Sequence, residues 1–144
     1  IQGHIAFHLP DAAMAFVGDA LFALGCGRMF EGTAPQFWES LCRLRVLPAD
    51  TQIFCAHEYT QSNARFARHA DPDNAALAAY ATTIDQDRAE GRATVPFPLA
   101  RELATNPFLR ADDPGLQTAW ANRGGRLGDA VATFAALREA KNAF

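Results

Sequence analysis

Three short apolar runs in the first sixty residues predict β-strands. In HIAFHL, residues 4–9, large apolar side chains alternate with smaller or polar ones, which is the two-residue period of a strand. The run AMAFVG, residues 13–18, is almost wholly apolar, as expected for a strand that is buried on both faces. The third run is TQIFC, residues 51–55. A glycine-rich loop and one helix are expected between the second and third strands.

The helix between these strands has a start signal, a core-facing stripe and an end. Thr33-Ala34-Pro35-Gln36 has the form of a capping box with proline in the first turn. Large apolar residues follow at helical spacing and predict the face that packs on the core. These residues are Phe37, Trp38, Leu41 and Leu44. The helix is expected to end at Leu47-Pro48-Ala49-Asp50.

From about Thr60 onward the apolar spacing is helical and no strand pattern is seen. TQSNARFARHA predicts one helix. Asp71-Pro72-Asp73 has the form of a second helix start, and Gly91 is its expected stop. The remaining expectations are a connection over ATVPFP (93–98), a short helix over Leu99–Ala104 and a further helix after Pro114-Gly115.

The last helix is expected to start near Asp129. Its predicted buried side carries Val131, Phe134, Leu137 and Phe144. The pattern therefore divides the chain near residue 61. The expected domains are an α/β part over residues 1–61 and an all-helical part over residues 62–144.

Composition excludes several classes of function. With 49% hydrophobic and 20% charged residues the chain is globular. A net charge of −3 argues against a nucleic-acid partner, and no apolar run is long enough to cross a membrane. Three cysteines without framework spacing predict a reducing compartment, the cytoplasm. Because the chain starts at Ile1 within a strand pattern, we expect a fragment or a processed chain.

Two polar residues follow directly after predicted buried strands. Asp19 comes after Gly18, and His57 comes after the third run. Functional groups gather beyond the carboxyl ends of strands in open α/β sheets, and a carboxylate with an imidazole can bind a divalent metal. A loop-capping aspartate and a hydrogen-bonded core histidine are the simpler interpretation, since two ligands are too few for a catalytic zinc site.

Other candidate motifs are weaker. Gly25-Cys26-Gly27 lacks the third glycine of a dinucleotide-binding fingerprint, and Cys55 is best interpreted as a small core residue. Arg138 and Lys141 share a face of the last helix. They form either a solvated pair that complements the helix dipole or a clamp for a carboxylate-bearing ligand.

An ordered set of motifs runs along the whole chain and resembles one family. Taken together the motifs are similar to the C-terminal portion of glyoxalase II, the hydroxyacylglutathione hydrolases of the metallo-β-lactamase superfamily. The motifs are GHIAFH, FVGDALFALGCGRMFEGT, FCAHEYTQSNARFA, ELATNPFLR and the pair Arg138-x-x-Lys141.

The resemblance implies a fold and a reaction. The fold would be α/β, the second half of the αββα metallo-β-lactamase fold, followed by an all-helical substrate-binding domain. The parent protein would hydrolyse S-(2-hydroxyacyl)glutathione, typically S-lactoylglutathione, to glutathione and a 2-hydroxy acid. It would act as a monomer in the cytoplasm, with no nucleic-acid or membrane partner.

The resemblance also implies site residues. Asp19 would bridge two divalent metal ions as the catalytic carboxylate, and His57 would be a terminal ligand of the second ion. Zinc is the expected metal, with iron or manganese as alternatives. The residues expected to contact the glutathione thioester are Arg28, Phe30, His57, Tyr59, Arg138 and Lys141.

The chain also departs from the family pattern. The motif THxHxDH is absent, and the next ligand histidine would stand immediately before Ile1, so two of the seven ligand positions remain. Smaller departures are Ala20, Ala56 and PFP at 96–98. We therefore expect the chain alone to be inactive. The alternatives are a mononuclear-iron persulfide dioxygenase, which the C-terminal helical block argues against, and a non-catalytic fragment that binds glutathione conjugates.

Overall fold

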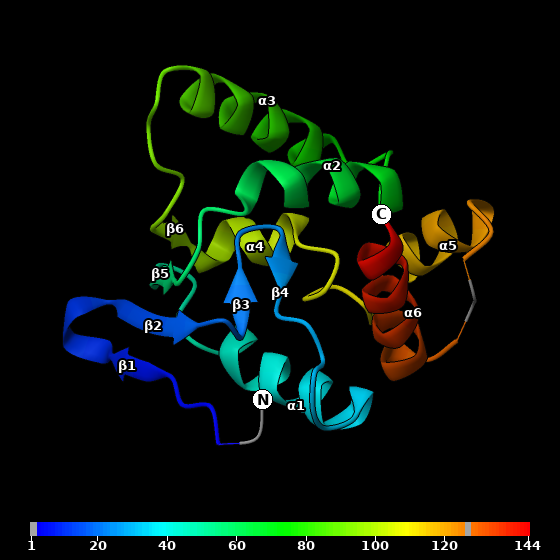
Figure 1. The fold of residues 1–144 in the computed structure, drawn as a ribbon, viewed down its shortest axis with the longest axis horizontal. Helices are drawn as coiled ribbons and strands as arrows, with labels where there is room; N and C mark the ends of the chain where they lie inside the picture. Colours follow the sequence, from blue (N-terminus) through cyan, green and yellow to red (C-terminus); the bar gives the residue numbers. More distant parts are fainter. Residues whose placement is uncertain (1–2, 126–127) are drawn as a thin grey trace.

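A small mixed sheet with helices around it forms the structure, a computed structural model that describes residues 3–125 and 128–144 (Figure 1). The four-stranded sheet has the order β1-β2-β5-β6, and a separate hairpin is made of β3 and β4. The strands are β1 Phe7–Leu9, β2 Met14–Gly18, β3 Leu21–Phe22, β4 Gly25–Cys26, β5 Gln52–Cys55 and β6 Phe97–Pro98. The helices are α1 Ala34–Arg45, α2 Thr60–Ala70, α3 Ala75–Ala89, α4 Leu99–Thr105, α5 Pro114–Asn122 and α6 Ala130–Ala143.

The two central strands of the sheet are parallel. β2 pairs with β5 in parallel register, whereas β1 on β2 and β6 on β5 are antiparallel. The chain passes from β2 through the hairpin and α1 before it returns as β5. The carboxyl ends of β2 and β5 therefore lie at the same edge of the sheet. Asp19 and His57, which follow these two strands, are brought to that edge.

Two expectations about the strands are wrong in detail. The strand expected over residues 4–9 is limited to β1, Phe7–Leu9. β2 is buried on one face rather than on both, because Ala15 and Val17 are buried while Phe16 is 41% exposed and stacks on Phe54. A five-residue apolar run does not reveal which of its faces a layer covers.

The β3–β4 hairpin lies where a glycine-rich loop is expected. Its residues 21–26 are all buried, and Leu24 in its turn has a φ of +56°. Two-residue strands are too short for any periodicity, so no hydrophobic pattern identifies them. The structure also adds β6 to the region expected to be wholly helical, because Phe97 pairs with Ile53 of β5.

The first helices mostly follow the sequence signals. At the start of α1 the Thr33 amide donates to Gln36 Oε1 at 3.0 Å, which confirms the capping box. α2 is confirmed. The expected start of α3 at Asp71-Pro72 is wrong, because the N-cap is Asn74, whose Oδ1 accepts from the Leu77 amide at 3.0 Å. Asp71, Asp73 and Asn74 are all residue types that cap helices well, and the structure uses the last of them.

The C-terminal helix buries part of its predicted face. Phe134 and Leu137 are buried and Val131 is partly buried, but Phe144 is 61% exposed, so its expected burial is wrong. One core cluster joins both parts of the chain, with Val17 and Ile53 from the sheet and Phe66, Phe108 and Phe134 from the helical region. The division of the chain near residue 61 stays a prediction. None of the helices in the described ranges is long and apolar enough to cross a bilayer.

The stability of the chain is expected to fall as the pH rises from about 4.5 through about 7. Glu102 in α4 is fully buried, and burial raises the pKa of its carboxyl from 4.5 to about 7, although the Leu24 amide and Asn106 oppose this change. Between these values the folded chain retains a proton that the unfolded chain releases. The free energy of unfolding should therefore drop by about 3 kcal/mol in total, starting near the unfolded pKa of 4.5 and levelling off only after the pH has passed the folded pKa of about 7.

Urea unfolding of the chain at pH 5 and pH 8 measures this loss. Tyr80 and Arg101 are the other ionisable groups that act on Glu102. The Glu102→Gln variant keeps the shape of the carboxyl without its proton equilibrium, so it should lose much less stability between the two pH values. An equal loss in wild type and variant would show that other groups cause the dependence.

Candidate functional site

Asp19 and His57 reach the same edge of the sheet because their strands are parallel. Gly18 ends β2 opposite Cys55, the last residue of β5, and the Ala56 amide donates to the Gly18 carbonyl at 3.1 Å. Gly18 has a φ of +53°, a conformation that glycine adopts without strain. The chain therefore turns out of the sheet at this point and presents the next residue, Asp19, at the strand end.

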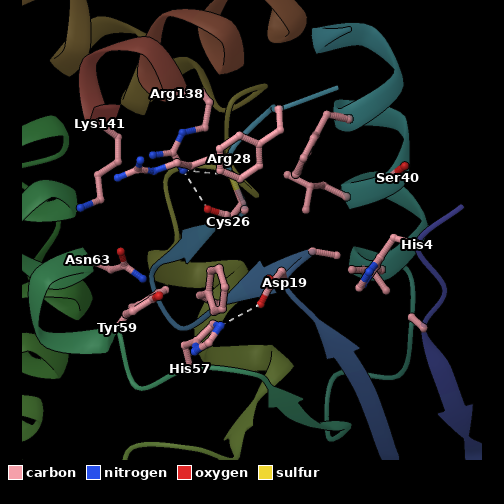
Figure 2. A pocket seen from close by; sticks show the side chains of 18 of the residues that line it. His4, Asp19, Cys26, Arg28, Ser40, His57, Tyr59, Asn63, Arg138 and Lys141 are labelled. Atoms are coloured by element: carbon pink, nitrogen blue, oxygen red, sulfur yellow. Dashed lines mark hydrogen bonds and ion pairs between the residues drawn. The ribbon is translucent and has the colours of Figure 1, made fainter. Parts of the chain in front are cut away.

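The side chains of Asp19 and His57 point toward each other (Figure 2). His57 Nε2 lies 3.5 Å from Asp19 Oδ1, and the two side chains are 48% and 47% exposed. Oδ1 itself is buried and has no hydrogen-bond partner among the described residues. Two ligands of one tetrahedral zinc ion lie about 3.4 Å apart when each metal–ligand bond is about 2.1 Å. The spacing and the unpartnered oxygen thus fit a pair of metal ligands.

The pair does not make a complete metal site by itself. Within residues 3–125 and 128–144, no group of three or more histidine, cysteine, aspartate or glutamate side chains is arranged to hold an ion. His4, the other nearby histidine, uses its Nε2 on the Val17 carbonyl at 2.9 Å. Ile1, which would directly follow the next expected ligand histidine, lies outside the described residues. The described chain therefore offers two ligands that fit and does not supply the rest.

The two residues that follow His57 in the loop after β5 hold it in place. The His57 ring stacks on Tyr59 with ring centroids 4.8 Å apart, and Tyr59 meets the edge of Phe22 at 5.2 Å. The next residue, Glu58, accepts hydrogen bonds from the amide and the hydroxyl of Thr94. These contacts fix the path of the loop, so packing sets the orientation of the His57 side chain.

Arg138 is part of the core and not a solvated surface residue. It is 4% exposed, its Nη1 donates to the Cys26 carbonyl at 2.8 Å, and its guanidinium lies over the Phe108 ring at 5.1 Å. The interpretation of Arg138 and Lys141 as a solvated dipole-complementing pair is therefore wrong for Arg138. Sequence spacing places the two residues on one face but does not show what that face packs against.

Lys141 and Arg28 add further positive charge beside Arg138. Lys141 is half-buried, and burial lowers its pKa, with further lowering by Arg138, Arg28 and Arg65. None of Arg28, Arg138 and Lys141 forms an ion pair with a described carboxylate. Such a group of cations attracts an anionic ligand. The anion would offset the repulsion between the positive side chains and would accept charge-assisted hydrogen bonds from them.

One cavity of about 900 Å³ joins the cations to the Asp19–His57 pair. Figure 2 shows the three cations gathered on one side of it and Asp19 with His57 on another. The cavity is lined by every residue that the sequence nominates: Asp19, Arg28, Phe30, His57, Tyr59, Arg138 and Lys141. Phe30 stands at the rim, since it is 74% exposed. The structure brings these residues together, and their roles stay predictions.

Cys26, Asn63 and His4 also line the cavity, although sequence reasoning did not select them. Their only sequence signal is membership of the same motif blocks. Burial raises the pKa of the Cys26 thiol to about 11, against the opposing effect of Arg138. Cys26 therefore stays protonated at neutral pH and is a poor nucleophile. Burial also raises the pKa of Cys55, whose Sγ donates to the His57 carbonyl.

Comparison with known proteins agrees with the motifs. The model of the family described as hydroxyacylglutathione hydrolase C-terminus matches residues 58–144. A hydroxyacylglutathione hydrolase of Erythrobacter litoralis is 60% identical over an alignment 144 residues long that covers 99% of this chain and 55% of that protein. Proteins of the same name from Hyphomonas neptunium and Methylococcus capsulatus are 57% and 53% identical, over 99% of this chain and 54% and 55% of their own length.

The chain thus spans about half the length of the curated relatives it matches. The family model covers more than half of the chain, and the relatives match along nearly all of it. The resemblance seen in the sequence motifs is confirmed, and the chain belongs to the hydroxyacylglutathione hydrolase family, glyoxalase II, as its C-terminal portion.

Proposed function

We propose that this chain supplies the C-terminal part of a thioester hydrolase that converts S-(2-hydroxyacyl)glutathione, typically S-lactoylglutathione, to glutathione and a 2-hydroxy acid. The observation that carries the proposal is the cavity in which the Asp19–His57 pair and the three cations meet. Metal ligands on one side and positive charge on another suit a substrate with a reactive thioester and anionic ends. The names of the relatives support the same substrate class.

Asp19 and His57 would hold part of a site for two divalent cations, with zinc as the expected metal and iron or manganese as alternatives. Bound metal would supply a hydroxide near neutral pH and a Lewis acid for the thioester carbonyl. Asp19 fits this role because its Oδ1 is buried without a hydrogen-bond partner within residues 3–125 and 128–144. His57 fits because Tyr59 stacking orients its ring and leaves Nε2 facing Asp19.

The cations would bind glutathione, which carries two carboxylates. Arg28 is exposed and Lys141 is half-buried, so both can reach a ligand in the cavity. Arg138 Nη1 already donates to the Cys26 carbonyl, so Arg138 would act mainly by its charge and by ordering the backbone ahead of Arg28. Phe30 and Tyr59 would contact the peptide part of the substrate from the rim of the cavity.

The remaining parts of the proposal concern the complete protein. The sheet would be the second half of an αββα metallo-β-lactamase fold, and α2–α6 would form the substrate-binding region. The missing ligands would come from a preceding half, so the chain alone would be inactive. The complete protein would act as a monomer, and its location would be the cytoplasm, a reducing compartment that suits three free cysteines.

A substrate comparison tests whether the cations recognise glutathione. The test protein, here termed the completed chimera, joins the unmatched part of the Erythrobacter litoralis relative ahead of this chain. We expect kcat/KM for S-lactoylglutathione to exceed that for the lactoyl thioester of N-acetylcysteamine roughly 100-fold, because the smaller thioester lacks both carboxylates. Lys141→Met should lower this preference roughly tenfold through KM, with kcat nearly unchanged.

The matched control is Arg68→Met, which removes an exposed cation of α2 that does not line the cavity. It should leave both kinetic constants close to wild type. Equal kcat/KM for the two thioesters would contradict recognition of glutathione by this cavity. Oxygen uptake with glutathione persulfide by an iron-loaded chimera, without thioester hydrolysis, would favour the dioxygenase alternative instead.

A further inference from the structure

The β3–β4 hairpin connects the two functional sides of the cavity. Asp19 lies just before β3, and Arg28 lies two residues after β4. The Gly27 amide donates to the Ala20 carbonyl at 3.3 Å, and a Cβ on Gly27 would stand 2.1 Å from the Asp19 carbonyl oxygen. The backbone at Asp19 is therefore in direct contact with the backbone that leads to Arg28. A shift of the hairpin would change the distance and the orientation between these two residues.

The turn of this hairpin is held by a buried carboxylate from the helical region. Glu102 of α4 accepts a hydrogen bond from the Leu24 amide at 2.7 Å through Oε2. Glu102 has no exposed surface, and Leu24 has a positive φ that a leucine rarely adopts. The contact joins residues 78 positions apart in the sequence. It keeps the turn in a conformation that leucine does not prefer by itself.

Asn106 completes the contact at the end of α4. Its Nδ2 donates to the Phe22 carbonyl at 3.2 Å, to the Gly25 carbonyl at 3.1 Å and to Glu102 Oε2 at 2.9 Å. Its Oδ1 accepts from the Phe108 amide at 2.9 Å, and the residue has no exposed surface. A third buried side chain, Asn63 of α2, donates to the Ala23 carbonyl at 3.1 Å.

The cost of this arrangement argues for a role beyond stability. A fully buried carboxylate without an ion-pair partner is unfavourable compared with apolar packing. Glu102 Oε1 and the Tyr80 hydroxyl are both buried without a hydrogen-bond partner among the described residues. The carboxylate and Asn106 do provide directional bonds to three residues of the hairpin, Phe22, Leu24 and Gly25.

We propose that Glu102 and Asn106 are positioning residues that hold the β3–β4 hairpin and thereby set Asp19 relative to Arg28, so that the thioester reaches the metal ligands when the glutathione part is bound. The proposal rests on the proposed function of the cavity. It gives a role to the motif ELATNPFLR, which contains both residues but lines no part of the cavity.

The test measures two substrates and local hydrogen exchange in the completed chimera. Asn106→Ala should lower kcat for S-lactoylglutathione at least roughly tenfold but change hydrolysis of the N-acetylcysteamine thioester less than threefold, because only the larger substrate spans both sides. Amide exchange over residues 19–28 should accelerate at least tenfold. Glu102→Gln, which can still accept from Leu24 and from Asn106, should stay close to wild type on every readout.

The control is Leu99→Ala, a truncation of a buried residue at the start of the same helix. It should lower the melting temperature without changing the ratio between the two substrates. If Asn106→Ala lowered the rates for both substrates by the same factor, so that their ratio stayed unchanged, the proposal would be overturned. If the wild-type chimera hydrolysed neither thioester, the proposed function would fail, and unaltered exchange over residues 19–28 would separately overturn the positioning role.

Discussion

The Asp19→Asn variant of the completed chimera is expected to lose at least about 1,000-fold in kcat for S-lactoylglutathione, which corresponds to roughly 4 kcal/mol of transition-state stabilisation. The carboxylate would neutralise part of the charge of two cations, and an amide cannot do so. Its Oδ1 is buried and has no hydrogen-bond partner among the described residues, so metal is the partner that the site suits. Metal content per chain, measured after dialysis, should fall in parallel.

The amide is nearly isosteric with the carboxylate, so this variant separates chemistry from folding. Because no hydrogen bond of the described protein depends on Asp19 Oδ1, the melting temperature of the metal-free variant should match that of metal-free wild type. Asp11→Asn, which changes an exposed aspartate in the turn before β2, serves as the control and should keep full activity. Retention of most of the activity by Asp19→Asn would remove Asp19 from the metal site.

The edge of the sheet that carries the candidate ligands could be predicted from sequence. Each apolar run stops where a polar residue begins, and a helix between two strands predicts the parallel pairing that brings Asp19 and His57 together. The local signals of α1 and α2 are equally direct, because the capping box and the helical spacing act within a few residues. The helix signals depend on neighbouring residues only.

The features that escaped prediction depend on contacts between distant residues. Arg138 is buried because α6 packs beside Cys26, which lies 112 positions earlier in the chain. The hairpin forms because Asn106 and Glu102 satisfy its turn, and neither residue gives any local signal of this. Phe16 and Phe144 are exposed although their apolar patterns are like those of buried residues, since a pattern does not specify which layer covers a face.

The second large effect expected is the difference between the isolated chain and the completed chimera. The isolated chain offers two fitting ligands, and within the described ranges no third histidine, cysteine or carboxylate joins them. Two ligands hold a divalent ion weakly and cannot fix a pair of ions, so the isolated chain should hydrolyse S-lactoylglutathione at least about 10,000-fold more slowly than the chimera. The isolated chain would therefore bind the glutathione part of the substrate but leave the thioester intact.

Glutathione binding and thioester hydrolysis can be measured separately in the isolated chain. The Arg28, Arg138 and Lys141 cluster lies wholly within the chain, so binding of S-methylglutathione should remain measurable by calorimetry even where hydrolysis is absent. Lys141→Met should weaken that binding, whereas Asp19→Asn should not. Loss of binding in Asp19→Asn but not in Lys141→Met would reverse the roles assigned to the two sides of the cavity.

The most direct test of the central claim is the initial rate of S-lactoylglutathione hydrolysis at equal concentrations of isolated chain and completed chimera, each with added zinc. We expect steady turnover by the chimera and a rate at the buffer background for the isolated chain. Turnover by the isolated chain at a rate near that of the chimera would contradict the claim that this chain carries only part of the metal site. A folded, metal-loaded chimera without turnover would contradict the proposed activity.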